Sequence, residues 1–183
     1  MNLILFIKRR WDYYVRCKGD RVAFLRLSGV QIGERCRIHR VFIGSEPWLI
    51  RIGDNVTVSD DVRFITHDGS TRLFRQDYPA LNQRFGNIYG TIVIEANVFI
   101  GAGAILMPNI VIGRDSIVGA GSVVTRSVPA RSVAAGNPAR VVKTVDEFIA
   151  EHLESYLPLE AQTQTELRQE LVEKLWGDHS QAN

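Results

Sequence analysis

Residues 92–128 read IVIEANVFIGAGAILMPNIVIGRDSIVGAGSVVTRSV, and this stretch decides the fold. Aliphatic side chains recur in it at every sixth position, at Ile94, Ile100, Leu106, Ile112, Val118 and Val124. Helices repeat near 3.6 residues and strands near 2, so a period of six indicates short strands joined by turns. The sequence IGAGA at residues 100–104 returns 18 residues later as VGAGS. Together the two periods predict a repeat solenoid in which three hexapeptides form one coil.

The same pattern extends toward the N-terminus. Ile52, Val58 and Phe64 continue it, and an earlier run begins at Ile32 and Ile38. Around residues 45–48, SEPW, the phase slips by two positions, which predicts a bulge in one coil. Stacked coils place equivalent residues about 4.8 Å apart, so the aliphatic positions should fill one narrow interior.

Residues 66–90 interrupt the repeat and predict a long excursion loop. Long loops in compact domains are usually functional or disordered. This loop is rich in aromatic and basic side chains, namely Phe74, Tyr78, Phe85, Tyr89, Arg72, Arg75 and Arg84. That content favours a packed, functional loop.

The two ends of the chain lack the repeat and are expected to be helical. Asp20 is a candidate N-cap for a helix over residues 21–27. Residues 146–156 and 165–176 place apolar side chains at helical spacing. We therefore expect an N-terminal helical extension over residues 1–30, a repeat domain over 31–143 with its excursion loop, and a C-terminal helical extension over 144–183.

Composition narrows the functional classes. A formal net charge of +2 over 183 residues argues against a nucleic-acid partner. Two cysteines, Cys17 and Cys36, provide no disulfide framework and suit a reducing compartment. The apolar run at residues 3–7 is too short to span a membrane, and its basic residues follow it, unlike those of a signal peptide. We expect a cytoplasmic protein, and peripheral contact of its N-terminus with the inner face of the membrane stays open.

Three features together resemble the hexapeptide-repeat acyltransferases: the repeats, the loop sequence THDG at residues 66–69, and the closing sequence AAGNPAR at residues 134–140. Within that family, the sequence is most similar to the maltose and galactoside O-acetyltransferases and to the bacterial polysaccharide O-acetyltransferases. The resemblance implies a left-handed parallel β-helix and a homotrimer with active sites between subunits. It also implies transfer of an acetyl group from acetyl-coenzyme A to a sugar, nucleotide sugar or surface-glycan intermediate.

His67 is the candidate catalytic residue. It lies on the loop that leaves the coils, and it matches the catalytic histidine of the family. An imidazole can accept the proton of an attacking hydroxyl near neutral pH. The adjacent Asp68 is a poor candidate for orienting it, because Asp-Gly is also an ordinary turn sequence. The group that orients His67 is left unassigned.

A second set of residues is expected to bind coenzyme A. Small residues at predicted corners would leave room for its pantetheine arm, namely Gly101, Ala102, Gly119 and Ala120. By resemblance, the coenzyme A-contacting positions are Ala102, Ala120, Thr125, Arg126, Arg140 and Lys143, whose basic members could meet phosphates. Phe99 stands where the sugar acetyltransferases of the family carry tryptophan.

Three other functions stay open. N-acetyl transfer to an amino sugar would use the same donor. A zinc hydratase resembling the γ-carbonic anhydrases needs three histidines around one metal. Only His39 and His67 lie within the repeats, so we expect no bound metal. A non-catalytic scaffold would leave the histidine-bearing loop without a purpose.

Overall fold

A computed structural model describes residues 17–74, 76–78 and 87–177 of the chain. The expectations for the first 16 residues and for Arg75, Arg84 and Phe85 fall outside the described residues. The chain divides into two compact units, the first ending at Phe148 and the second beginning at Ile149. The division into three parts made from the sequence stays a prediction.

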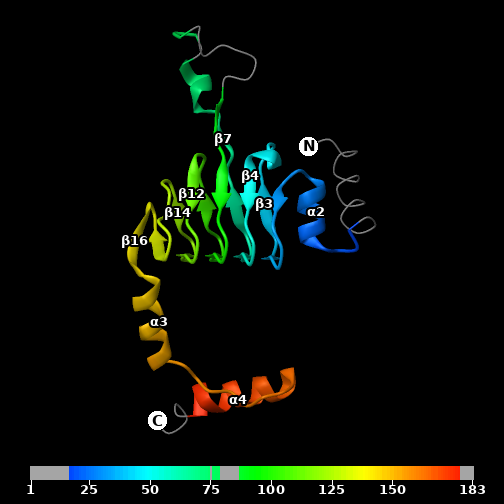
Figure 1. Ribbon diagram of the computed structural model, residues 1–183, viewed down its shortest axis with the longest axis vertical. Helices are drawn as coiled ribbons and strands as arrows, with labels where there is room; N and C mark the ends of the chain where they lie inside the picture. The colour runs from blue at the N-terminus through cyan, green and yellow to red at the C-terminus, as the bar shows by residue number, and fades with distance from the viewer. Residues whose placement is uncertain (1–16, 75, 79–86, 178–183) are drawn as a thin grey trace. The chain divides into compact units, whose positions relative to one another are not determined.

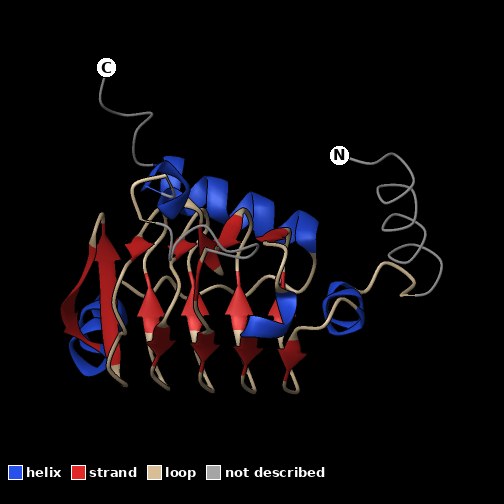
Figure 2. Ribbon diagram, turned by 90° about the horizontal axis from the view of Figure 1, so that it is seen from above, coloured by secondary structure: helices blue, strands red, loops and turns tan. Residues whose placement is uncertain are grey.

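The first unit is a parallel β-helix whose three sides are sheets of short strands (Figures 1 and 2). The first side has the order β1 (Gln31–Ile32), β4 (Ile50–Ile52), β9 (Ile92–Ile94) and β12 (Ile110–Ile112). The second has β2 (Arg37–Ile38), β5 (Thr57–Val58), β10 (Phe99–Ile100), β13 (Ile117–Val118), β15 (Ser132–Gly136) and the antiparallel β16 (Ala139–Thr144). The third has β3 (Val41–Ile43), β6 (Val62–Phe64), β11 (Ile105–Leu106) and β14 (Val123–Val124).

The interior of the coils is made by the side chains that recur every sixth position. Ile94, Ile100, Leu106, Ile112, Val118 and Val124 are at most 1% exposed. Their strands pair in register from coil to coil, so each aliphatic side chain stacks on its equivalents. The buried Ser116 hydroxyl donates to the carbonyl of Pro129 at 2.9 Å, which satisfies the polar group inside this core. The predicted core is confirmed.

The glycines at the corners are required by the stacking itself. A Cβ atom on Gly101 would overlap the backbone of Ala120 in the following coil. The second glycine of each corner, Gly103 in one coil and Gly121 in the next, adopts a positive φ angle of 70° or 68°, respectively. Glycine is the residue that takes this left-handed conformation at the least cost. The repeated Gly-Ala-Gly corner therefore reflects both close backbone approach and turn geometry.

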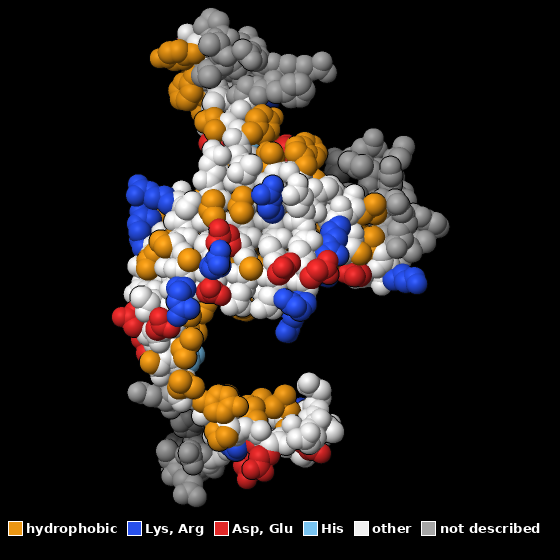
Figure 3. Space-filling model, in the orientation of Figure 1, with side chains coloured by type: hydrophobic (Ala, Val, Ile, Leu, Met, Phe, Trp, Pro, Cys, Tyr) orange, Lys and Arg blue, Asp and Glu red, His pale blue; other side chains and the backbone are white. Residues whose placement is uncertain are grey.

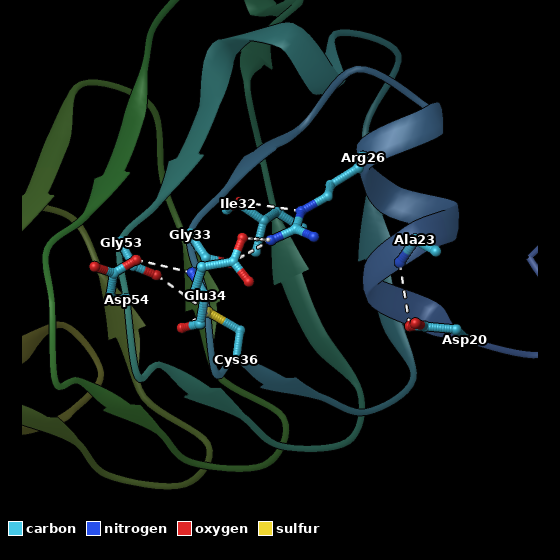
Figure 4. Close-up of polar contacts among 9 residues, drawn as sticks. All are labelled: Asp20, Ala23, Arg26, Ile32, Gly33, Glu34, Cys36, Gly53 and Asp54. Carbon is cyan, nitrogen blue, oxygen red and sulfur yellow. Dashed lines mark hydrogen bonds and ion pairs between the residues drawn. The ribbon is translucent and has the colours of Figure 1, made fainter.

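A short helix covers the N-terminal end of the coils. Helix α2 (Arg21–Leu27) begins at Asp20, whose side chain accepts the backbone N–H groups of Val22 and Ala23 at 2.8 and 3.1 Å. From its last turn, Arg26 donates to the carbonyls of Ile32 and Gly33 and pairs with Glu34 (Figure 4). The predicted helix and its cap are confirmed. The guanidinium of Arg26 ties the helix to the first coil.

The two interruptions of the repeat also have structural counterparts. The phase slip contains the 3₁₀ helix η2 (Pro47–Leu49). The excursion loop leaves and returns through an antiparallel pair, β7 (His67–Asp68) and β8 (Ile88–Tyr89), with the 3₁₀ helix η3 (Ser70–Phe74) between them. Hydrophobic side chains gather on this loop (Figure 3), with Leu73 79% exposed.

The C-terminal part of the chain is helical, as predicted. Helix α3 (Val145–Glu154) follows β16 directly, and α4 (Gln164–Trp176) begins with a capping box between Thr163 and Glu166. Lys174 of α4 pairs with Glu170 at 2.7 Å. Within the described ranges no helix is both long and apolar enough to cross a membrane.

The stacked interior gives a direct test of the fold. Replacing Ile112, which is fully buried, with alanine should lower the free energy of unfolding by about 2–5 kcal/mol, because a cavity remains in the core. Its neighbour Val111 is 39% exposed, so Val111→Ala should cost no more than about 1 kcal/mol. Urea denaturation measures both values, and equal losses would contradict the inward orientation of residue 112.

Candidate active site

His67 stands at the neck of the excursion loop, where β6 ends and β7 begins. Its Nδ1 atom lies 2.8 Å from Oε2 of Glu46, a residue of the phase slip in the preceding coil. A carboxylate can only accept a hydrogen bond, so Nδ1–H donates and the lone pair is left on Nε2. The imidazole side chain is 34% exposed and that of Glu46 only 13%. The arrangement therefore presents an oriented proton acceptor backed by a partly buried carboxylate.

Glu46 is held by a small network of hydrogen-bond donors. The Thr66 hydroxyl, which belongs to a residue 1% exposed, donates to the same Oε2 atom at 2.7 Å. Burial favours the neutral acid, but the hydrogen bonds from Thr66, His67 and Ser45 outweigh it, so the pKa of Glu46 lies below its ordinary value. Glu46 is consequently ionised at neutral pH, as its position against the imidazole requires.

The sequence did not identify Glu46 as the partner of His67. The signal that could have found it was the phase slip, because a bulge in one coil can bring an extra side chain beside the next. Asp68 is exposed and instead accepts the backbone N–H of Ser70 at 2.8 Å, which agrees with the turn interpretation. Hydrogen bonding from Ser70 also lowers the pKa of Asp68.

Tyr89 is a second neighbour of the imidazole that the sequence did not single out. It lies opposite His67 in the β7–β8 pair, and the two ring centres are 5.8 Å apart with a tilt of 49°. His67 itself lines an open cavity of about 700 Å³, whose other walls include Ser28, Phe42, Gly44, Ser45 and Ile65. A substrate in this cavity would therefore reach the imidazole.

Six of the predicted coenzyme A residues fall along the edges of the third side. Gly101, Ala102, Gly119 and Ala120 form the corner between the second and third sides in consecutive coils. Thr125 and Arg126 follow β14 at the opposite edge of the third side, which is the edge that carries His67. Two coil spacings separate them from His67, or about 10 Å.

The corner of small residues has two backbone N–H groups for which no protein acceptor is found. In the described part of the chain, the N–H groups of Ala102 and Ala120 donate to no protein atom, whereas the flanking Gly101 and Gly119 N–H groups bond to the next coil. Both alanines are exposed. An amide-containing chain laid along this edge could accept from them.

The remaining predicted residues lie on the second side. Phe99 is 45% exposed and points outward from β10. Phe99 pairs with Ile117, Ile117 with Val133, and Val133 with Lys143 of β16. Strand β16 also carries the exposed Arg140. Within one chain the structure thus groups Phe99 with the alanine corner but does not bring Arg140 or Lys143 to His67.

Comparisons with known proteins were made against this geometry. The family described as bacterial transferase hexapeptide (six repeats) matches residues 91–126. Protein CapG of Staphylococcus aureus is 42% identical over 134 residues, which cover 72% of this chain and 75% of that protein. The chain belongs to the hexapeptide-repeat transferases. Its predicted left-handed β-helix with helical extensions is confirmed by the solved structures of this acyltransferase family.

Two further relatives connect the family to acetyl transfer. The galactoside O-acetyltransferase of Escherichia coli is 33% identical over 122 residues, covering 66% of this chain and 56% of that enzyme. The chain therefore spans little more than half of that relative. A hexapeptide-repeat acetyltransferase from Vibrio cholerae, solved with acetyl-coenzyme A, matches with a TM-score of 0.53 at 25% identity, covering 74% of this chain and 82% of that one.

The metal and nucleic-acid alternatives can be compared with the same structure. No group of three His, Cys, Asp or Glu side chains in the described part of the chain is placed to hold a metal ion. Acidic and basic side chains are interspersed over the visible face of the coils, with no large patch of one sign (Figure 3). Among the described residues, neither observation indicates a functional site other than the His67 cavity.

The carboxylate at Glu46 should make stability depend on pH. Because its pKa is lowered in the folded protein, its stabilisation is present above the ordinary value of 4.5 and is lost as the pH falls through the lower folded-state pKa. The difference in unfolding free energy between wild type and Glu46→Gln should thus be larger at pH 7 than at pH 3.5. Urea titrations at the two pH values measure this difference. The exposed Glu173→Gln serves as the control. A difference for Glu46→Gln that does not change with pH would contradict the assignment.

Proposed function

We propose that this protein transfers the acetyl group of acetyl-coenzyme A to a hydroxyl of a sugar, nucleotide sugar or surface-glycan intermediate, with His67 as general base. The observation that carries the proposal is the Glu46–His67 pair beside an open cavity, 2.8 Å apart and backed by a buried hydroxyl. Membership of the acyltransferase family supports the type of reaction, and the similarity to the galactoside O-acetyltransferases supports a saccharide acceptor.

The proposed reaction is a direct attack without a covalent enzyme intermediate. The acceptor hydroxyl attacks the thioester carbonyl while Nε2 of His67 removes its proton, so a C–O bond forms as the C–S bond breaks. The proton then passes from the imidazolium to the departing thiolate of coenzyme A. Glu46 keeps Nδ1 protonated throughout and stabilises the imidazolium, because its carboxylate is already ionised.

The donor is proposed to lie along the alanine corner of the coils. Its pantetheine amides would accept from the N–H groups of Ala102 and Ala120, which have no acceptor within the described part of the chain. Its phosphates would meet basic side chains toward the end of the repeats, among Arg126, Arg140 and Lys143, with Thr125 and Phe99 as further contacts. Arg126 suits this function because it is exposed and, among the described residues, is bound to no acidic partner.

A homotrimer would bring donor and base together. In one chain the alanine corner and His67 lie on opposite edges of the third side, on the order of 15 Å apart for five extended residues. A thioester on that corner is thus distant from the imidazole of its own chain. A neighbouring subunit that packs against this side could supply the His67 that acts on it, as the family resemblance implies.

N-acetyl transfer to an amino sugar remains the alternative. The same base could deprotonate an ammonium group, so the geometry at His67 does not separate it from O-acetylation. The product decides: an ester is cleaved by mild hydroxylamine, whereas an amide is stable to it.

The base assignment has a sharp test. His67→Ala should lower kcat for acetyl transfer by about 100- to 10,000-fold, because the proton acceptor is lost. Its affinity for coenzyme A, measured by calorimetry, should stay unchanged. His152→Ala, in helix α3, serves as the control and should retain wild-type turnover. Full activity of His67→Ala in a thiol-release assay would exclude His67 as the base.

The donor site is tested separately. Ala120→Leu should raise the KM for acetyl-coenzyme A by about 10-fold or more with little change in kcat, because the larger side chain occupies the corner. Ala96→Leu, at an exposed position on a different corner, is the matched control. The proposal fails if both variants change KM equally.

A further inference from the structure

The hydroxyl of Thr66 differs from the other buried polar groups of the coils. Four polar side chains are buried among the described residues, and three of them bond to backbone groups, namely Ser116, Ser122 and Ser132. Thr66, which is 1% exposed, instead donates to a side chain, to Oε2 of Glu46 at 2.7 Å. Because this hydroxyl stabilises neither a turn nor a strand, its burial needs another explanation.

The bond from Thr66 ends on the oxygen atom that also faces His67. Oε2 of Glu46 accepts from the Thr66 hydroxyl and lies 2.8 Å from Nδ1 of His67. A glutamate side chain turns about three bonds, and two donors on one of its oxygens select one orientation of it. Since Thr66 is almost fully buried, it acts on the imidazole through the carboxylate of Glu46.

The same bond favours the charged form of Glu46. Burial raises the pKa of this carboxyl, and the hydrogen bond from Thr66 is the largest of the interactions that lower it, ahead of those from His67 and Ser45. His67 is the titratable group that faces the carboxylate, and its other two partners are hydroxyls. Without the Thr66 hydroxyl, Glu46 would become a neutral acid at a higher pH in the folded protein.

The backbone at Thr66 is fixed on two sides, which gives its hydroxyl a defined position. The N–H of the preceding Ile65 donates to the carbonyl of Leu106 in the next coil at 2.9 Å. The carbonyl of Thr66 accepts the N–H of Gly90, where the excursion loop returns, also at 2.9 Å. Gly44 leaves room for the hydroxyl, since a Cβ atom there would lie only 3.0 Å from Oγ1 of Thr66. Thr66 thus connects the excursion loop, the coils and the phase slip.

We propose that Thr66 is a positioning residue of the active site, whose hydroxyl locks the Glu46 carboxylate against Nδ1 of His67. The inference rests on the proposed function, in which His67 is the base. Packing alone does not require a hydroxyl at this position, because a valine side chain has nearly the same shape and would fill the same space. Loss of the hydroxyl alone should therefore weaken the site while the coils stay folded.

The titration of Glu46 tests this role without any acceptor. Carbon-13 NMR of carboxyl-labelled glutamate follows Glu46, assigned by the signal that Glu46→Gln loses, with the exposed Glu166 as internal reference. In Thr66→Val the midpoint for Glu46 should move to a pH about 1 higher or more, the change expected when a hydrogen bond to a charged group is lost. Thr66→Ser keeps a hydroxyl and should keep the wild-type midpoint. Ser116→Ala, which removes a buried hydroxyl elsewhere in the coils, should keep it as well.

Turnover provides the second measurement. Thiol release from acetyl-coenzyme A is followed with glucose, galactose, N-acetylglucosamine and a uridine diphosphate sugar as acceptors. With the acceptor that reacts fastest, Thr66→Val should lower kcat by about 10- to 100-fold and leave KM for acetyl-coenzyme A unchanged. The acidic limb of its pH profile should move to higher pH, because Glu46 is protonated earlier. Thr66→Ser should restore most of the activity and the wild-type pH profile.

The inference is overturned if Thr66→Val leaves the midpoint of Glu46 unchanged, or if Ser116→Ala moves it equally. It is also overturned if Thr66→Val retains wild-type kcat and pH profile while His67→Ala is inactive. Full activity of His67→Ala, or no thiol release by the wild type with any of the acceptors, would instead contradict the proposed function. The NMR midpoints would then still decide whether Thr66 holds Glu46, so the two failures are separable.

Discussion

Each coil of this protein can bury its aliphatic side chains only between the coil before it and the coil after it. The side chain at every sixth position meets its equivalent in the next coil at strand-pairing distance, and Ile100, Leu106 and Ile112 are completely buried as a result. This stacking removes the aliphatic side chains from water, which is the main favourable contribution to folding. The interior is thereby fully occupied, and chemistry is confined to corners, edges and interruptions.

That confinement explains the arrangement of the site. The corners present backbone N–H groups and small side chains, because larger ones would collide with the next coil at Gly101. The interruptions supply what the repeat lacks: the phase slip provides Glu46, and the excursion loop provides His67 and Tyr89. A regular surface that can hold an extended ligand is thus combined with two irregular segments that carry the reactive groups.

Periodicity was sufficient to predict the coil, its core and the flanking helices. The interior residues, the helix capped by Asp20 and the role of the corner glycines all follow from local rules that act over a few residues. The pairing of Glu46 with His67 did not follow, because it joins residues 21 apart in sequence through a bulge whose geometry no period specifies. The tilted contact between the Tyr89 ring and the imidazole was equally hidden, since it depends on the register of an antiparallel pair that closes a long loop.

The position of Glu46 has a consequence for how the protein loses activity on warming. Its carboxylate belongs to the first coil, whose strand β3 is the terminal strand of the third sheet and pairs with β6 alone, with the short helix α2 as the only cover on that coil among the described residues. The outermost layer of a solenoid is the part that opens most readily. Brief fraying there would release the imidazole from its partner while the remaining coils stayed intact. Turnover should then decline on warming well before spectroscopic signals of the β-structure change.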